Sequence, residues 1–204
     1  MTARRLVLAA LALALVSCGG ILPKPPPAPQ LFRLTPIAAA TSPLQASDAQ
    51  LVVEPPIASA SLDIERIALA RGANGFDYFA DAAWTDRAPA MLQALIIDSL
   101  ENAGQIRIVA PPSGELRPDA VLQTDLRQFE AVYQGGDTPT VRVRLDCRLV
   151  RMPDRSVLAA RSFVGEASPR SNSTPSIVAA FDQAFHAAMD GLAPWAAQTL
   201  SARR

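Results

Sequence analysis

Histidine and cysteine are nearly missing from this 204-residue chain, which has one histidine and two cysteines. Zinc sites and serine or cysteine catalytic centres normally need several such side chains. The sequence also has no Gly-x-Ser-x-Gly turn, no His-Glu-x-x-His motif and no phosphate-binding loop ending in Gly-Lys-Ser/Thr. We therefore expect no enzymatic centre, no metal site and no other cofactor.

Long apolar runs and blocks of basic charge are scarce too. The longest apolar run, Leu6–Val16, has 11 residues, about half the length that a membrane-spanning helix requires. The 19 basic residues balance the 19 acidic ones without a basic cluster, which argues against nucleic acid as a partner. A hydrophobic content of 50% with 19% charged residues is typical of a globular domain. These numbers predict one folded domain that does not itself cross a bilayer.

The residues around that apolar run match an export signal. Arg4 and Arg5 precede it, and a small residue follows it directly before Cys18, an order typical of a cleaved signal peptide. The tetrapeptide Leu-Val-Ser-Cys that ends at Cys18 also resembles the bacterial lipobox, whose cysteine is lipidated and becomes the first residue after cleavage. This resemblance implies a lipoprotein signal peptide at 1–17 and acyl chains on Cys18. An ordinary secretory signal that happens to contain a cysteine is the alternative.

A proline-rich segment follows that cysteine. Residues 19–30 contain five prolines, which favour an extended polyproline II conformation of about 3.1 Å per residue. Residues 18–30, the lipidated cysteine and its tether, can therefore reach about 35 Å from the membrane surface. Gly19 stands where an aspartate marks inner-membrane retention in enteric-type bacteria, so we expect an outer-membrane location, with the inner membrane as the alternative.

The rest of the chain, 31–204, is dominated by short segments with strand character. Each has β-branched, aromatic or alternating apolar residues and ends at glycine, proline or polar residues. Strands are expected at 31–34, 51–54, 66–70, 75–84, 106–109, 120–133, 141–149 and 156–166. The irregular pattern of 120–133 indicates a bulge, and the last three strands form an antiparallel meander.

Two amphipathic helices complete the pattern. The first is capped by Thr85 or Asp86 and ends at Gly104. The second starts at Thr174, and Pro194 should kink or redirect its last turn. Strands outnumber helices, so the predicted class is α+β: one domain with a twisted, mostly antiparallel sheet and both helices on one face.

The remaining reactive side chains have structural explanations. Cys147 lies on the apolar side of an alternating strand, where a thiol behaves as a small hydrophobe. It has no disulfide partner if Cys18 is lipidated. His186 lies among apolar neighbours on the last helix, and we interpret it as a structural or surface residue.

The order of these segments also matches a known pattern. Its parts are the lipobox, Phe32-Arg33-Leu34, Leu51-Val52-Val53 before Pro55-Pro56, Leu62-Asp63 before Arg66-Ile67, Tyr78 leading to Trp84, the helix from Pro89 through Leu95, Ala120-Val121-Leu122, Phe129 and a terminal helix closing on Trp195. Together they resemble the ABC-type transport auxiliary lipoproteins, the family that includes the lipoprotein of the paraquat-inducible operon. The resemblance covers nearly the whole chain after the signal.

Members of that family accompany ABC transporters whose substrate-binding subunits carry MCE domains and move lipids or other apolar molecules. The resemblance implies a palmitate-bearing periplasmic lipoprotein, a non-catalytic auxiliary subunit that docks the MCE protein of an ABC permease and ATPase. It also implies a ring of copies around the end of the MCE tunnel. Tyr78, Phe79 and Trp84 are candidate contact residues, although each fits a core position better. Two alternatives stay open: a stand-alone carrier with a cavity for hydrophobic ligands, and a general cell-envelope assembly lipoprotein.

Overall fold

The computed structural model describes residues 28–40, 46–113 and 117–202. The expected signal peptide, Cys18 and most of the tether lie outside these residues. The described strands are β1 (Gln30–Phe32), β2 (Ser47–Val53), β3 (Ile57–Ala58), β4 (Arg66–Arg71), β5 (Gly75–Trp84), β6 (Ile106–Ala110), β7 (Ala120–Tyr133), β8 (Thr140–Arg151) and β9 (Val157–Ala167), and the described helices are α2 (Ala88–Ala103) and α3 (Thr174–Ser201).

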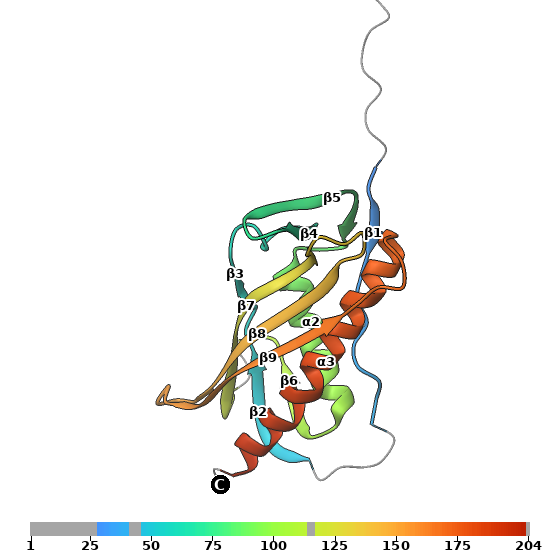
Figure 1. Ribbon diagram of the computed structural model, residues 1–204. Coiled ribbons are helices and arrows are strands. Elements are labelled where there is room, and N and C mark those ends of the chain that lie inside the picture. The colour runs from blue at the N-terminus through green and yellow to red at the C-terminus, as the bar shows by residue number, and fades with distance from the viewer. Residues whose placement is uncertain (1–27, 41–45, 114–116, 203–204) are drawn as a thin grey trace, which may run out of the picture.

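One long strand, β7, forms the centre of the sheet (Figure 1). One edge of β7 pairs with β8 along most of its length, and β8 pairs with β9, both in antiparallel orientation. The other edge pairs with three short parallel strands in succession: β2 at its start, β3 in its middle and β4 at its end. β6 then extends the sheet beyond β2, and β5 and β1 extend it beyond β4. Within the described residues, β9 has β8 as its single neighbour, so its outer edge is free.

The alternating sequence of β8 explains how the meander packs. The alternating apolar residues of this strand are at most 1% exposed: Val141, Val143, Leu145, Cys147 and Leu149. The arginines and the aspartate between them lie on the opposite face of the sheet, since side chains along a strand alternate between faces. The register of β7 against β8 shifts between Leu126 and Gln128, so the bulge predicted within 120–133 is confirmed.

Both helices cover the apolar face of the sheet, and their ends follow local chemistry. α2 has Pro89 in its first turn, where a missing N–H is harmless. It ends at Gly104 (φ 64°), whose N–H donates to the carbonyl oxygen of Glu101 at 3.0 Å. α3 lies over β9 and β8 so closely that Gly165 of β9 faces the backbone of Ala184. A β-carbon at that position would have no room.

Aromatic rings fill the space between the sheet and the helices. The ring centroids of Trp84 and Phe129 lie 5.3 Å apart, and those of Trp84 and Phe181 lie 5.2 Å apart. Phe129 and Phe181 complete the triangle at 4.9 Å. All three side chains are at most 1% exposed, so strands β5 and β7 and helix α3 share one continuous core.

The predicted α+β class is confirmed, with local corrections. β2 begins at Ser47, four residues before the strand expected at 51–54, and Ile57–Ala58 form a strand that the sequence did not predict. The N-cap of α2 is Arg87, without a side-chain cap, and the carboxylate of Asp86 instead accepts a hydrogen bond from the N–H of Arg87. Pro194 does not end α3, which continues to Ser201, because one missing backbone donor is tolerated in a helix that packs on a core; a kink at Pro194 stays a prediction.

Candidate docking surface

The segment that follows β1 is fixed to the last helix. The N–H of Thr35 donates to Asp182 Oδ1 at 2.7 Å, and His186 Nε2 lies 2.9 Å from the carbonyl oxygen of Thr35. β1 itself pairs with β5 in parallel orientation. The chain therefore enters the domain along a defined path, and His186 has the structural role that the sequence predicts.

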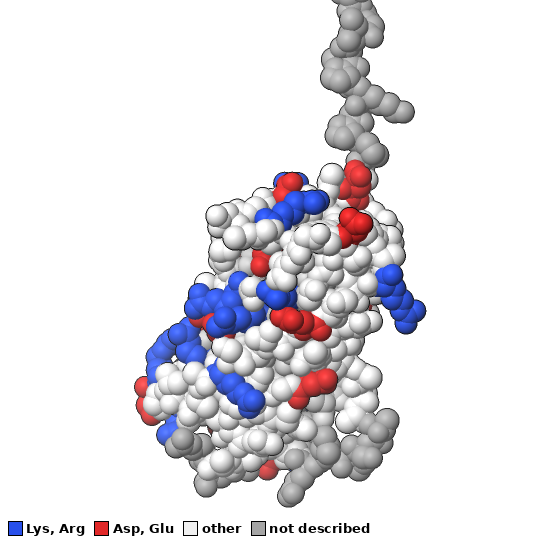
Figure 2. All heavy atoms as spheres, viewed as in Figure 1, with Lys and Arg blue, Asp and Glu red and all other residues white. Residues whose placement is uncertain are grey.

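The outer face of the meander carries a network of arginines and aspartates. Arg127 bridges two strands, with contacts of 3.1 Å to both Asp125 and Asp146. Arg144 approaches Asp146 at 3.0 Å, and Arg148 approaches Asp125 at 3.4 Å. In Figure 2 the basic side chains run across this face and down to the end of the β8–β9 hairpin. Part of the network lines a polar hollow of about 430 Å³ on the sheet surface.

Asp146 is held ionised at the centre of this network. Burial opposes its ionisation, but hydrogen bonds from Ser162, Arg144 and Arg127 outweigh that effect, so the pKa of Asp146 lies below its ordinary value. The Ser162 hydroxyl donates at 2.6 Å and therefore ties β9 to the network. Because the arginines are largely exposed, the network fixes the surface shape of the meander more than it adds stability.

The three candidate aromatic contact residues, for which a core position was the better fit, lie in the core or pack against it. Trp84 is 1% exposed, so its role is in the core. Tyr78 and Phe79 are half-buried and pack against that core. The Tyr78 hydroxyl donates to the carbonyl oxygen of Ser61 at 3.1 Å. Phe76, which the sequence pattern did not single out, is 43% exposed and lies edge-on to Tyr78.

Cys147 is a core residue. Its side chain is 1% exposed, and its Sγ lies 3.6 Å from the Thr124 hydroxyl. Burial raises the pKa of the Cys147 thiol to about 12, so the nucleophilic thiolate is absent near neutral pH. The structural interpretation of Cys147 is confirmed.

A second hollow lies between the segment after β1 and helix α2. It has a volume of about 450 Å³, and apolar side chains such as Leu34, Met91 and Leu95 line it beside Asp86 and Asp98. It is an open surface groove and not an enclosed cavity. Among the described residues, no group of histidine, cysteine or carboxylate side chains could hold a metal ion, and no helix is long and apolar enough to span a membrane.

Comparisons with known proteins identify relatives of this fold. A crystal structure of a Xanthomonas campestris protein of the DUF330 family has a TM-score of 0.76 and 27% identity, covering 85% of this chain and 98% of that one. A second crystal structure, of an uncharacterized protein, shares the fold with a TM-score of 0.67 at 14% identity, covering 83% and 99% of the two chains.

A sequence relative is 31% identical over 149 residues: an uncharacterized protein of Bradyrhizobium diazoefficiens, of which 39% is covered, against 72% of this chain. The chain thus spans about two fifths of the length of that relative. The family model of the ABC-type transport auxiliary lipoprotein component matches residues 32–193, from the last residue of β1 into α3. This chain therefore belongs to the ABC-type transport auxiliary lipoprotein family.

Proposed function

We propose that this protein is the lipid-anchored, non-catalytic auxiliary subunit of an MCE-type ABC transporter that moves lipids or other hydrophobic molecules across the cell envelope. The observation that carries the proposal is the family match over residues 32–193, which begins directly after the predicted tether. The domain docks the MCE protein, which belongs to the same transporter as the permease and the ATPase. A ring of several copies around the tunnel end would multiply this contact.

The anchor supplies the local concentration that docking needs. Each buried CH₂ group of an acyl chain contributes about 0.8 kcal/mol to membrane binding, so two or three chains on Cys18 hold the protein for long periods. A tether of about 35 Å then confines the domain near the membrane, and effective concentrations on the order of millimolar follow from such linkers. A modest intrinsic affinity for the MCE protein is sufficient under these conditions.

The packed interior favours a docking role over ligand carriage. A carrier needs a cavity between the helices and the sheet, and the rings of Trp84, Phe129 and Phe181 occupy that space. The hollow beside α2 is open to solvent and has two carboxylates in its lining. It would leave most of a lipid chain in water.

Lipidation and partner capture can be tested together in cells. Full-length protein with a C-terminal tag is expected to incorporate radioactive palmitate, to sediment with outer-membrane fractions and to co-purify with the MCE protein. Cys18→Ser is expected to abolish the label, whereas Cys147→Ala, which changes the other cysteine, keeps it. Equal labelling of the Cys18→Ser variant would refute the anchor. Absence of the MCE protein from the purified wild type would refute the transporter assignment, and sedimentation with the inner membrane would correct the location.

A further inference from the structure

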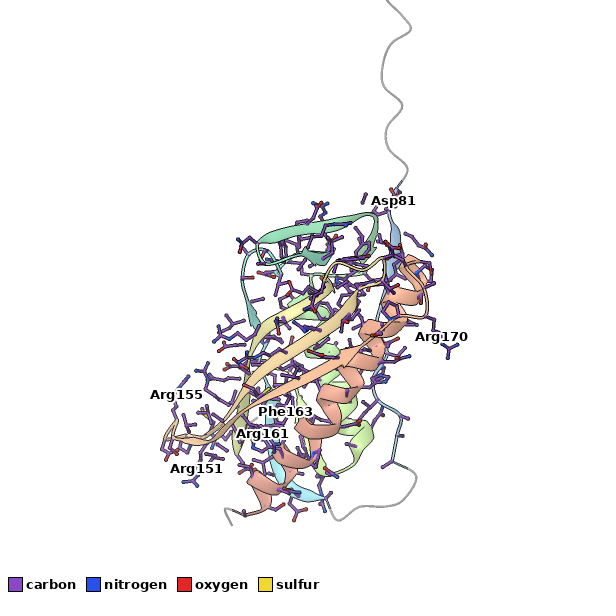
Figure 3. All side chains as sticks on the ribbon, viewed as in Figure 1. Asp81, Arg151, Arg155, Arg161, Phe163 and Arg170 are labelled. Carbon is purple, nitrogen blue, oxygen red and sulfur yellow. The ribbon has the colours of Figure 1, made fainter. Side chains whose placement is uncertain are left out.

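The turn between β8 and β9 carries an excess of arginine. From Arg148 to Arg161 the chain has four arginines and a single carboxylate, Asp154. Arg148 is paired with Asp125. The other three, labelled in Figure 3, form no ion pair with another described residue: Arg151, Arg155 and Arg161. Arg161 lies back along β9, opposite Cys147 of β8, so the name arginine tip is kept for Arg151 and Arg155 at the turn.

The arginine tip projects from the body of the domain. Figure 1 shows the β8–β9 hairpin extending past the helices, on the opposite side of the molecule from β1, where the chain enters. The tip therefore lies on the side of the domain away from the point at which the chain enters. Arg155 is exposed, Arg151 is half-buried, and Val157, which pairs with Val150 next to Arg151, is 60% exposed. The tip thus combines cationic groups with an apolar contact.

The backbone holds this tip in one conformation. The N–H of Arg151 donates to the carbonyl oxygen of Ser156 at 2.8 Å, and the N–H of Met152 donates to that of Asp119 at 2.9 Å. Arg155 has φ 58°, a left-handed conformation that glycine or asparagine adopts at lower cost. An arginine in this position is best explained by a use for its side chain, since strained residues persist mainly where function needs them.

The chemistry of the tip selects an acidic partner. A guanidinium group presents a planar fork of N–H donors that matches a carboxylate with two parallel hydrogen bonds. Within the part of the chain that the structure describes, these arginines have no carboxylate partner to displace before binding. Anionic phospholipid headgroups offer similar chemistry, but the tip lies on the side of the domain away from the tether. An acidic protein surface in the periplasm is therefore the better match.

We propose that the arginine tip, with Val157, is the surface by which this protein binds a carboxylate-rich face of the transporter's periplasmic MCE subunit. The proposal rests on the proposed function and adds to it the contact element and the charge of its partner. Opposite charges also speed the encounter of the two proteins, so binding through the tip depends strongly on salt.

Charge reversal at the tip provides the test. The binding of full-length protein in detergent to the purified MCE subunit is measured by biolayer interferometry at low and high salt. Arg151→Glu with Arg155→Glu is expected to weaken binding at least about tenfold and to remove most of its salt dependence. The matched control is Arg33→Glu with Arg170→Glu, which changes the charge equally at two exposed arginines that lie outside the tip. This control is expected to bind like the wild type.

Each outcome decides a different point. A charge-reversed tip variant that binds the MCE subunit as tightly as the wild type overturns the proposed contact and leaves the proposed function standing. A wild type that does not bind the MCE subunit refutes both. Binding to vesicles of phosphatidylcholine with phosphatidylglycerol is measured separately. A tip variant that loses vesicle binding but still binds the MCE subunit would show that the tip binds lipid and would overturn the proposed protein partner. Circular dichroism of every variant, and the milder Arg151→Gln with Arg155→Gln, separate lost contacts from lost folding.

Discussion

The close approach of α3 to β9 makes Gly165 the most sensitive backbone position of the meander. A β-carbon added there would lie 1.8 Å from the carbonyl oxygen of Ala184 and 3.0 Å from the amide nitrogen of Ala188. Both contacts are with backbone atoms of a helix, which cannot rotate away as a side chain can. Ordinary contacts begin at 3.4 Å, so Gly165→Ala requires α3 and β9 to separate by about 1.6 Å, the difference between these two distances.

The expected loss of stability follows from that separation. Overpacking a core costs typically about 1–3 kcal/mol, and we expect Gly165→Ala to reach or exceed the upper end because no side chain can absorb the strain. Retreat of α3 would also loosen the contacts of Phe181 with Trp84 and Phe129. In a domain of this size about 3 kcal/mol corresponds to a fall of roughly 6–12 °C in the melting temperature.

Two other glycines provide graded controls. At Gly191 an added β-carbon would meet the Phe163 ring at 3.1 Å, and a small tilt of the ring relieves this close contact. Alanine also stabilises a helix by up to about 1 kcal/mol relative to glycine. Gly136→Ala has its nearest contact at 3.9 Å and should change stability by less than about 0.5 kcal/mol. Urea and thermal unfolding of the full-length variants, followed by circular dichroism, give the order. Gly165→Ala with a stability within error of Gly136→Ala would refute the packing argument.

Two further predictions concern the meander. Because the pKa of the Cys147 thiol is about 12, it should not react with a disulfide reagent at pH 8 in the folded protein and should react at once in denaturant; rapid labelling of the native protein would contradict its burial. Asp146→Asn should lower stability by up to about 1 kcal/mol at pH 7. Because the pKa of Asp146 is lower in the folded protein than in the unfolded chain, its carboxylate stabilises the fold at pH values above the unfolded pKa of about 3.9. This stabilisation is lost as the pH falls through the folded pKa. The free energies of unfolding of the wild type and Asp146→Asn, measured in urea, should therefore converge near pH 2. A difference that persists there would show that Asp146 acts through packing and not through its charge.

The elements that the sequence predicted best are those whose burial follows a local period. The alternation from Val141 to Leu149 predicted β8, and Gly104 predicted the end of α2, because both signals depend on neighbouring residues. β3 was not predicted, since Ile57 and Ala58 become a strand by pairing with Asp125 and Leu126 far along the chain. Its two residues carry no periodicity of their own.

The surface features needed the assembled sheet. Arg148 of β8 meets Asp125 of β7, and Arg127 of β7 meets Asp146 of β8, because the pairing of the two strands brings them together. Spacing within one strand does not indicate these contacts. The arginine tip stands out once these ion pairs are known, because they separate the neutralised arginines from the unpaired ones. Trp84 did not need the assembled sheet: its sequence position fitted the core better than a contact surface, and the structure places it in the core.

The unequal lengths of the strand pairings decide which part of the sheet separates first when the domain is pulled. β1 is held to β5 over Gln30–Phe32 alone, whereas β7 and β8 share a ladder from Val132 to Ala120. If the amino terminus is anchored in the membrane and a partner is bound to the β8–β9 hairpin, a pulling force between them would act along these strands. The short pairing of β1 with β5 should separate first, while the rest of the sheet stays folded. The tether would then become longer, so the domain could stay bound to a partner that moves.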